Sequence, residues 1–558
     1  MSGADPQTYR ETEHKLRVHG LYRLPDLTTV PAAGVGALTE LAALVLTATY
    51  YDTPDLRLAR SRITLRRREG GTDDGWHLKL PAEEDAKDPA TADGRSAPAV
   101  RDEVRLPASQ DSAGAERPEP PARLLELVLA LTRGAQVEAV ATLRTQRLPR
   151  ELRSADGRLL AELTDDTVSV LDGPHVAARF RELEVESRDG TPDELAAVVA
   201  ALVGSGAVEG GLPSKAVRAL GPAALAPPDV PDPGPVGPAD PAGAAIRAHL
   251  ARHTAAFVAQ DLRVRRDLPD SVHQMRVAAR RLRSGLKVFG PLVDAQWAGD
   301  LRAELAWIAA ELGEVRDREV LERRLLADLA SLEAVAPVAP ADPGPGGAAR
   351  TPDGVAGVDR TDRRDVAAAA AVVRRALDAE RAPAAAALRE AMVSDRYLRL
   401  LDALVSAARE PVLTEAADRR CSHVLPPLLA KAWRRLVRDA RRLDPDGPDE
   451  SWHETRIAAK GARYAAEALV PVFGQPARKI AKRIEQVTEL LGEHQDAVIA
   501  ALTTRRLAAG RRVTGPTGFV LGLLHEYERA AVGRARADFV AVWPDLSGAV
   551  DPHRLGQG

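Results

Sequence analysis

Charged side chains that recur at every second position in the N-terminal part of the chain are the residues best suited to chemistry. They alternate along Glu11-Thr-Glu-His-Lys15 and Glu182-Leu-Glu-Val-Glu186, and Arg66, Arg68 and Lys79 lie in similar segments. Alternate residues of a β-strand share one face. Carboxylates bind Mg²⁺ or Mn²⁺, whereas Arg and Lys bind phosphate oxygens. Together these residue types indicate a site for an anionic, metal-bound, phosphate-bearing ligand.

The elements that must position these side chains are short strands. Alternating runs separated by turn-forming or polar stretches predict strands, at residues 47–52, 62–68, 76–80, 100–106, 139–147, 159–163, 167–171 and 179–187. One face of these runs is charged and the other is apolar. If the apolar face packs outward, the charged face encloses a polar interior. Such an interior costs free energy when no ligand is bound, because buried like charges repel one another. The pattern is typical of an antiparallel barrel or sandwich.

A second set of candidate residues lies on two copies of one motif in the C-terminal part of the chain. In each copy basic residues recur at intervals of three or four, so they share one helix face. The first basic stripe consists of His273, Arg276, Arg280, Arg283 and Lys287. The second basic stripe consists of His453, Arg456, Lys460 and Arg463, and a helix upstream of it aligns Lys431, Arg435, Arg438 and Arg442. Because the first stripe contains no acid, the pattern favours a polyanion as ligand over a solvated helix face.

A further repeat lies downstream of each stripe, in Leu312-Gly-Glu-Val-Arg-Asp317 and Leu491-Gly-Glu-His-Gln-Asp496. A duplication of this size predicts two similar helical bundles packed face to face. Asp317 and Asp496 are candidates to pair with stripe arginines, and ordinary helix-end chemistry explains the motif equally well. Glu467 takes the place in the second stripe that Lys287 has in the first, so we expect weaker anion binding at that end.

The composition limits the classes of protein that fit. At 558 residues the chain is long enough for more than one domain with a sizeable core. A net charge of −3 argues against a generally basic nucleic-acid binder, as does the scarcity of aromatic residues, which make up 3% of the chain. A single cysteine excludes a disulfide framework or a cysteine metal site within the chain. No signal peptide or membrane-spanning run is evident, so we expect a soluble protein of the cytoplasm.

Two segments rich in Pro and Gly divide the chain. Residues 222–241 predict an extended linker between a β-rich domain at 8–221 and a helical domain at 242–545. A second stretch, at about 335–362, predicts a disordered insertion in the helical domain. The expected organisation is therefore a two-domain α+β protein.

Several motifs of the N-terminal domain resemble the CYTH domain of the triphosphate tunnel metalloenzymes. They are Glu11-x-Glu13-x-Lys15, Tyr50-Tyr-Asp-Thr-Pro-Asp-Leu-Arg-Leu58, Leu65-Arg-Arg-Arg68, Leu78-Lys79, Glu182-Leu-Glu-Val-Glu186 and Pro213-Ser-Lys215. The resemblance implies an N-terminal antiparallel eight-stranded β-tunnel with flanking helices, which binds a triphosphate and Mg²⁺ or Mn²⁺. The resemblance also implies roles for individual residues. The catalytic residues would be Glu11, Glu13 and Lys15. The metal ligands would be Glu11, Glu13, Asp165, Glu184 and Glu186, although Asp166 competes with Asp165 for its position. The phosphate-binding residues would be Lys15, Arg66, Arg68, Lys79, Arg147 and Lys215.

The two basic stripes and the repeated Leu-Gly-Glu-x-x-Asp motif resemble the CHAD domain. This resemblance implies a C-terminal all-α domain of two pseudo-symmetric bundles, whose basic surface binds long-chain inorganic polyphosphate. The binding residues would be the two stripes together with Lys431, Arg435 and Arg438.

The leading hypothesis is a metal-dependent inorganic triphosphatase with an appended polyphosphate-binding module, located in the cytoplasm and at polyphosphate granules. Three alternatives stay open: a polyphosphate-binding protein with little turnover, an organic triphosphatase acting on thiamine triphosphate, and an adenylate cyclase. Nucleic acid is disfavoured as a partner, and a membrane is not expected. The sequence leaves the oligomeric state and the preferred metal ion open.

Overall fold

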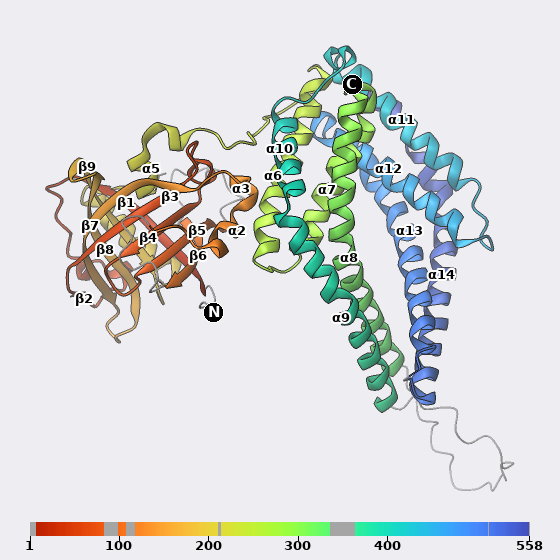
Figure 1. Ribbon diagram of the computed structural model, residues 1–558, viewed down its shortest axis with the longest axis horizontal. Helices are drawn as coiled ribbons and strands as arrows, with labels where there is room; N and C mark the ends of the chain where they lie inside the picture. Colours follow the sequence, from red (N-terminus) through yellow and green to blue (C-terminus); the bar gives the residue numbers. More distant parts are fainter. Residues whose placement is uncertain are drawn as a thin grey trace, which may run out of the picture. The chain divides into compact units, whose positions relative to one another are not determined.

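The chain divides into two compact units, a tunnel unit (Met1–Asp229) and a helical unit (Val230–Gly558) (Figure 1). The computed structural model describes residues 7–82, 99–107, 118–209, 214–334, 363–511 and 513–556. The predicted insertion at 335–362 lies outside these residues. Among the described helices, none combines the length and the apolar character that a membrane span requires.

The tunnel unit is a closed antiparallel β-barrel. Its long strands are β1 (Gln7–Val18), β3 (Leu44–Asp52), β4 (Thr64–Glu69), β5 (Gly75–Pro81), β6 (Ala99–Pro107), β7 (Glu138–Arg153), β8 (Leu159–Asp172) and β9 (His175–Ser187). They follow the order β1–β6–β5–β4–β3–β7–β8–β9, and β9 pairs back with β1 to close the barrel. The short strands β2 (Ala37–Glu40) and β10 (Val208–Glu209) pair with β7 and β1. This topology confirms the predicted eight-stranded antiparallel barrel.

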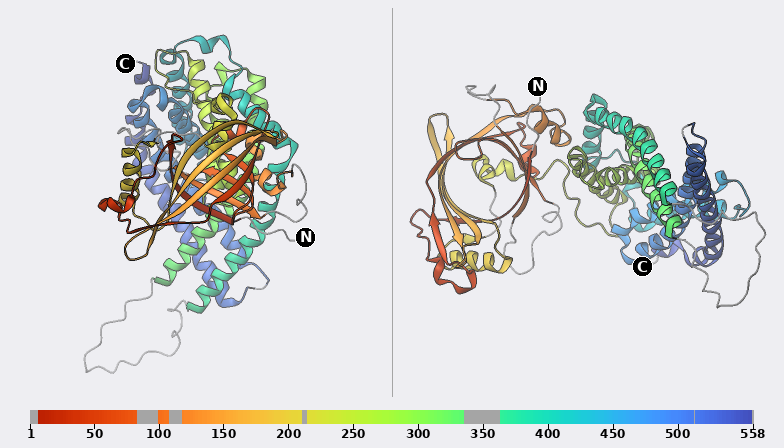
Figure 2. Two further views of the ribbon diagram at one scale, coloured as in Figure 1. Left: turned by 90° about the vertical axis from the view of Figure 1, so that its left-hand side faces the viewer. Right: turned by 90° about the horizontal axis from the view of Figure 1, so that it is seen from below.

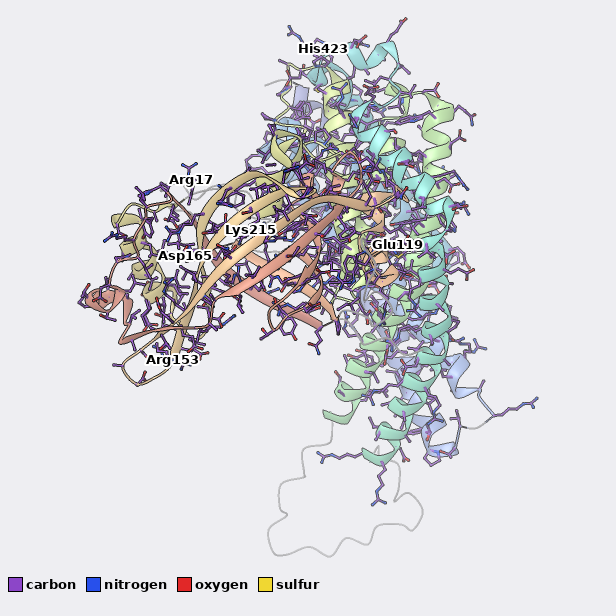
Figure 3. The ribbon with its side chains drawn as sticks, turned by 60° about the vertical axis from the view of Figure 1, so that its left-hand side comes forward. Arg17, Glu119, Arg153, Asp165, Lys215 and His423 are labelled. Atoms are coloured by element: carbon purple, nitrogen blue, oxygen red, sulfur yellow. The ribbon has the colours of Figure 1, made fainter. Side chains whose placement is uncertain are left out.

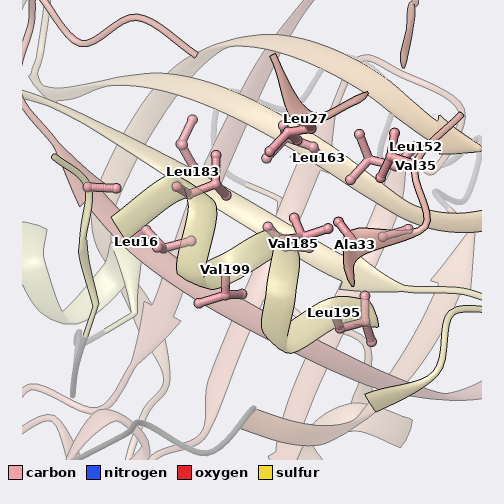
Figure 4. Packing of buried hydrophobic residues seen from close by; sticks show 14 of the residues in the cluster. Leu16, Leu27, Ala33, Val35, Leu152, Leu163, Leu183, Val185, Leu195 and Val199 are labelled. Atoms are coloured by element: carbon pink, nitrogen blue, oxygen red, sulfur yellow. The ribbon is translucent and has the colours of Figure 1, made fainter. Parts of the chain in front are cut away.

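Alternation along the strands separates an apolar outer face from a charged interior. On the outer face, Leu16 and Leu183 are buried beneath helix α4 (Pro192–Gly204), which packs Val199 against them (Figure 4). A capping box at Thr191 starts this helix. Burial of apolar area contributes about 25 cal/mol per Å², so covering this face determines which side of each strand points inward.

Helix α5 (Lys215–Leu220) covers one end of the barrel. The Ser214 side chain accepts a backbone hydrogen bond and caps the helix. Ala216 packs against Leu143 and Val168 on the inner wall of the barrel. In the view along the barrel, this helix lies within the ring of strands (Figure 2, right). The packing therefore presents the first residue of α5 to the barrel interior. Three further short helices, α1 (Arg57–Arg60), α2 (Ala122–Leu127) and α3 (Leu129–Thr132), lie between strands.

Strand β8 differs from the prediction. The sequence pattern predicted two strands, at 159–163 and 167–171, whereas one strand runs unbroken from Leu159 to Asp172. The acidic pair at the supposed break, Asp165 and Asp166, points to opposite faces of the sheet. Arg181 binds the first carboxylate and Arg147 the second. Acidic residues are depleted in strands, but here each has an ion-pair partner, and the strand continues.

The Pro-rich segment predicted as a linker is held by the units that it joins. Near its start, Asp229 forms ion pairs with Arg57, Arg60 and Arg133 of the tunnel unit. Near its end, the Asp240 carbonyl accepts a hydrogen bond from the backbone of Cys421 in the helical unit. Much of the segment is therefore tied to folded structure. The proposed domain limits stay predictions.

The helical unit is all-α. Its helices are α6 (Ala242–Arg265), α7 (Ser271–Val288), α8 (Ala295–Ala334), α9 (Arg363–Val393), α10 (Asp395–Arg409), α11 (Cys421–Ala440), α12 (Asp449–Phe473), α13 (Gln475–Ala508) and α14 (Gly515–Ala549). The two basic stripes lie on α7 and α12. Both halves contribute to one apolar core, with Leu325 of α8, Val373 of α9, Ala500 of α13 and Leu521 of α14 (Figure 1). The duplicated halves are thus packed together.

Candidate functional site

The β1–β9 pairing brings predicted site residues to one wall of the barrel interior. Glu13 lies opposite Glu186, and Lys15 lies opposite Glu184. The Lys15 ammonium is 3.1 Å from a carboxylate oxygen of Glu13 and 3.4 Å from one of Glu184. Two segments that are far apart in the sequence therefore form one charged cluster.

Helix α5 and strand β7 add two cations to this wall. The Lys215 ammonium lies 2.8 Å from Asp166, 3.0 Å from Glu182 and 2.8 Å from Glu184. Arg147 donates two hydrogen bonds to Asp166, at 2.8 and 2.6 Å, and a third to Glu184 at 3.0 Å. Two predicted phosphate-binding residues thus converge on the same acidic side chains.

A second cluster surrounds Glu103 of β6, a fully buried carboxylate (0% exposed). It lies 3.6 Å from Lys79, 3.5 Å from Arg66 and 3.0 Å from the His77 ring. Arg105 also pairs with it. Glu103, His77 and Arg105 are missing from the predicted site, although the segment around Glu103 shows the same alternation of charges as the other strands.

The remaining predicted residues of the interior are also paired. Lys79 forms an ion pair with Glu11, and Arg68 forms one with Asp73. Glu186 pairs at 2.5 Å with an arginine outside the predicted set. Every predicted cation of the tunnel therefore has an acidic partner in the described structure.

These ion pairs set the protonation states of the interior. Burial acts against the charge of Glu13, but Lys15 and Lys79 outweigh burial and lower the pKa of Glu13. Burial likewise acts against the charge of Glu184, whose pKa the nearby Lys215 and Lys15 hold well below its ordinary value. The acidic partners of Lys215 outweigh its burial and raise its pKa. At neutral pH these acids and bases are therefore ionised.

Asp165 does not face the interior, which corrects its prediction as a metal ligand. Arg181 binds its two carboxylate oxygens on the outer face, at 2.8 and 2.7 Å. In the β8–β9 ladder Asp165 is opposite Leu183, a member of the outer apolar cluster. Successive residues of a strand point to opposite faces, so the inward acid is Asp166. Figure 3 labels Asp165 and Lys215. The Lys215 ammonium contacts Asp166, the acid that faces the interior.

The donor chemistry of the interior fits a hard divalent cation. Glu13, Glu184 and Glu186 lie on paired strands and offer the oxygen ligands that Mg²⁺ and Mn²⁺ prefer. Among the residues that the structure describes, no three acidic, histidine or cysteine side chains are arranged to hold a metal ion. The carboxylate oxygens of the interior are instead paired with Lys and Arg side chains. A metal ion would therefore enter together with an anion that draws these cations away.

In the helical unit, each Leu-Gly-Glu-x-x-Asp motif places its aspartate beside a stripe arginine. Asp317 of α8 lies 2.6 Å from Arg276, and Asp496 of α13 lies 3.7 Å from Arg456. Both motifs lie in the interior of long helices. The predicted ion pairs are confirmed, and helix-end chemistry does not explain the motif.

Where α7 packs against α12, the stripes bring cations together without enough acids to neutralise them. The Arg280 guanidinium lies 5.3 Å from the centre of the Tyr464 ring. The Nε atoms of Arg280 and Arg456 are buried and have no hydrogen-bond partner. Burial, followed by the charges of Arg456 and Arg280, lowers the pKa of Lys460 to about 7. Buried donors without acceptors, beside a lysine that holds its proton weakly, indicate an anion site.

The end of the second stripe is already neutralised. Arg463 lies 2.7 Å from Glu467 and also pairs with Glu485. His453 at the other end contacts the side chain of Gln495 at 2.6 Å. Burial and neighbouring charges, that of Arg463 among them, lower the pKa of Arg280, so Arg463 borders the cluster at the α7–α12 contact with its own charge already paired.

The C-terminal end of the first stripe lies near α11. Burial and the charge of Arg435 lower the pKa of Lys287, so these two residues are neighbours. Arg435 and Arg438 lie 3.6 and 3.0 Å from Asp439. Burial and then Arg316 lower the pKa of His273 at the stripe's first position. The exposed members of the predicted set include Arg283, Lys287, Lys431, Arg435, Arg438 and His453.

Comparison with known proteins identifies both parts of the chain. The CYTH domain model matches residues 9–210, and the CHAD domain model matches residues 248–505. The chain therefore belongs to the proteins in which a CYTH domain is followed by a CHAD domain. An uncharacterized protein of Mycobacterium tuberculosis is 31% identical to it over 574 residues, which cover 98% of each chain. Triphosphate tunnel metalloenzymes with a CYTH domain depend on divalent metal ions, and this domain is characteristic of phosphoryl-transfer enzymes.

Solved structures are similar to portions of the chain. PptA from Streptomyces chartreusis is 26% identical, with a TM-score of 0.44, and the match covers 55% of this chain and 100% of that one. The CHAD domain from Ricinus communis is 24% identical, with a TM-score of 0.42, and covers 57% of this chain and 96% of that one. The adenylyl cyclase-like protein HpAC1 from Hippeastrum is 16% identical, with a TM-score of 0.24, and covers 38% and 98%.

Proposed function

We propose that the tunnel unit hydrolyses inorganic triphosphate or short polyphosphate with Mg²⁺ or Mn²⁺, and that the helical unit binds long-chain polyphosphate. The content of the barrel interior carries the first part. Cations from β1, β4, β5, β7 and α5 face carboxylates from β1, β6, β8 and β9. Without a ligand these groups neutralise one another. A metal-bound triphosphate offers partners to both, since its oxygens bind the cations and its metal ion binds the carboxylates.

The covered end of the barrel supports a short substrate. Ala216 of α5 packs against Leu143 and Val168 there, and we propose that the helix closes this end of the barrel to a long chain. A polyphosphate then enters only from the opposite end. Its terminal phosphates are the part that reaches Lys215, while the rest of the chain stays outside. This geometry favours triphosphate and chain ends over the interior of a long polymer.

The residues of the chain act by position and charge. Lys15, Arg147 and Lys215 hold phosphate oxygens on one wall of the interior, while Arg66 and Lys79 do so near Glu103. Phosphoryl transfer depends chiefly on such positioning and on neutralising the charge of the transferred group. Glu13, Glu184 and Glu186 would hold the metal ion, which supplies further charge neutralisation and an activated water when bound.

The contact between α7 and α12 supports the second part of the proposal. Arg280 and Arg456 each bury an Nε–H group that has no acceptor, and Lys460 lies among their charges. A polyanion would supply acceptors to both arginines and a counter-charge to the lysine. Asp317 and Asp496, which pair with Arg276 and Arg456, accept no hydrogen bond from these two Nε–H groups.

A substrate panel tests the enzyme. Phosphate release would be measured for tripolyphosphate, thiamine triphosphate and ATP, each with Mg²⁺ or Mn²⁺, on the full chain. The proposal predicts the highest rate with tripolyphosphate. A higher rate with thiamine triphosphate would indicate an organic triphosphatase, and cyclic AMP formed from ATP would indicate a cyclase. No turnover of any substrate would leave a polyphosphate-binding protein and overturn the enzyme assignment.

Retention on immobilised polyphosphate tests the helical unit. Arg280→Glu is expected to lower the salt concentration at which the chain elutes, because it reverses a charge at the α7–α12 contact. Arg375→Glu, an equal charge change at an exposed position of α9, is the matched control. Equal retention on duplex DNA would contradict specific binding of polyphosphate.

A further inference from the structure

The helical unit contains a cavity of about 470 Å³ that the proposed functions leave unused. Side chains of α6, α7, α12 and α13 line it, and the second basic stripe ends there with Arg463 and Glu467. Cavities of about 300–1,000 Å³ hold small molecules in other proteins. The size and the convergence of four helices make this a candidate ligand site.

Cations outnumber acids around the cavity. Its charged lining consists of Arg252, Arg281, Arg463, Arg478, Lys482, Glu467 and Glu485. Arg463 pairs with both acids, whereas Arg478 and Lys482 form no ion pair with any described residue. Unpaired cations at a concave site favour a ligand that carries several negative charges, such as a di- or triphosphate.

The lining also contains rings and apolar surface, which would form no favourable contact with a bare polyphosphate chain. The rings of His249 and His253 lie edge to face, with their centres 4.5 Å apart. Burial lowers the pKa of His249 to about 4 and that of His253 to about 2, so both rings are uncharged at neutral pH. Ala468, Val470 and Pro471 add an apolar wall. Uncharged rings and apolar surface fit a ligand with a flat ring of its own.

The environment of Glu467 indicates the same class of ligand for an independent reason. Its Oε2 atom is buried and accepts no hydrogen bond, although Arg281 Nη2 lies 3.4 Å away. A buried acceptor of this kind favours a ligand that donates a hydrogen bond. Polyphosphate has no such donor at neutral pH, and its charge is repelled by a carboxylate. Ribose hydroxyls and the amino groups of bases are donors.

We infer that this cavity binds a nucleoside di- or triphosphate, with its phosphates at Arg478 and Lys482 and its nucleoside against His253 and Glu467. The site shares no residue with the barrel interior, and it adjoins the α7–α12 contact through Tyr464. It therefore stands or falls independently of triphosphate hydrolysis, and its cations Arg478 and Lys482 lie outside both basic stripes.

Calorimetric titration of the full chain with ATP and with ADP, in EDTA to prevent turnover, tests this inference. Lys482→Glu and Glu467→Ala are each expected to weaken ATP binding at the cavity by about tenfold or more, the loss typical of a hydrogen bond to a charged group. Lys479→Glu makes the same charge change at an exposed position of α13 outside the lining and is expected to have little effect. Arg147→Ala, in the barrel, is expected to leave the cavity's binding isotherm unchanged.

Three results would overturn the inference. The first is the absence of ATP and ADP binding to the wild-type chain. The second is binding that Arg147→Ala abolishes and Lys482→Glu leaves intact, which would place the nucleotide in the barrel. The third is tripolyphosphate binding as tightly as ATP and more tightly still after Glu467→Ala, which would make the cavity part of a polyphosphate surface. Thermal unfolding shows whether each variant is folded. Should Glu467→Ala fail that check, the exposed Lys482→Glu decides.

Discussion

If the helical unit binds polyphosphate as proposed, Lys460 is expected to make that binding depend on pH. In the free protein, burial and then Arg456 and Arg280 lower the pKa of Lys460 to about 7, and Arg276 of α7 adds to the effect. Asp496 of α13 acts in the opposite direction but does not offset them. A phosphate oxygen beside the amine favours the ammonium form and returns the pKa toward its ordinary range. Binding above pH 7 must therefore take up a proton.

Linkage gives the size of this effect. As pH rises above 7, the free protein loses the Lys460 proton while the complex keeps it. The affinity then falls by up to about tenfold, or about 1.4 kcal/mol, for each pH unit until the pKa of the complex is reached. A cluster of arginines alone would stay charged and show no such dependence. For the free protein, the lowered pKa predicts a free energy of unfolding that rises above pH 7, because the unfolded chain holds this proton more tightly.

The assay is calorimetric titration with polyphosphate of one defined length at pH 7, 8, 8.5 and 9, in two buffers that differ in ionisation enthalpy. The wild-type chain is expected to take up close to one proton near pH 8.5. Lys460→Arg keeps the charge at every pH, so its affinity should change little with pH and exceed that of the wild type at pH 9. Binding without proton uptake near pH 8.5, or a Lys460→Arg variant with the wild-type pH profile, would refute this reasoning.

The other ion pairs lead to three further predictions. Asp166→Asn is expected to lower tripolyphosphate turnover by about tenfold or more because it releases Arg147 from its fixed position, whereas Asp165→Asn should change only urea stability, by about 1–3 kcal/mol. The reverse pattern would show that the strand faces are wrongly assigned. Lys215→Met leaves three interior acids without their shared counter-ion and should destabilise the tunnel unit by about 3–5 kcal/mol in urea unfolding; unchanged stability would contradict the pairing. Asp317→Asn removes an acid that competes with polyphosphate and should raise the salt concentration needed for elution; earlier elution would show that the acid instead supports binding.

Alternation of residue types predicted the barrel and most of its interior. Glu11, Glu13 and Lys15 share a face whatever the partner strand is, because the period of a strand is local. The same rule could not decide between Asp165 and Asp166, since an acidic pair resembles a turn and a break would reset the alternation. Only the partners on the two faces, which come from distant strands, resolve the choice.

Spacing along a helix likewise shows which residues share a face but not what packs against that face. The first and second basic stripes resemble each other in the sequence. In the fold, Lys460 is crowded by arginines from both stripes, whereas Arg463 is neutralised by two acids. Glu467 lies four residues after Arg463 on α12, so the spacing contains that acid, whereas Glu485 of α13 and the arginines of α7 come from other helices and could not be derived from it. That Glu467 lines a cavity could not be derived from the spacing either.

The central claim is that the chemistry belongs to the barrel and that the helical unit binds. The most direct test is the initial rate of phosphate release from tripolyphosphate with Mg²⁺, for the wild type, Glu13→Ala and Arg280→Glu at equal concentrations. Removal of an interior carboxylate should reduce the rate by about 100-fold or more, while the charge reversal on α7 should leave it near that of the wild type. Full activity of Glu13→Ala, or loss of activity in Arg280→Glu alone, would contradict the claim.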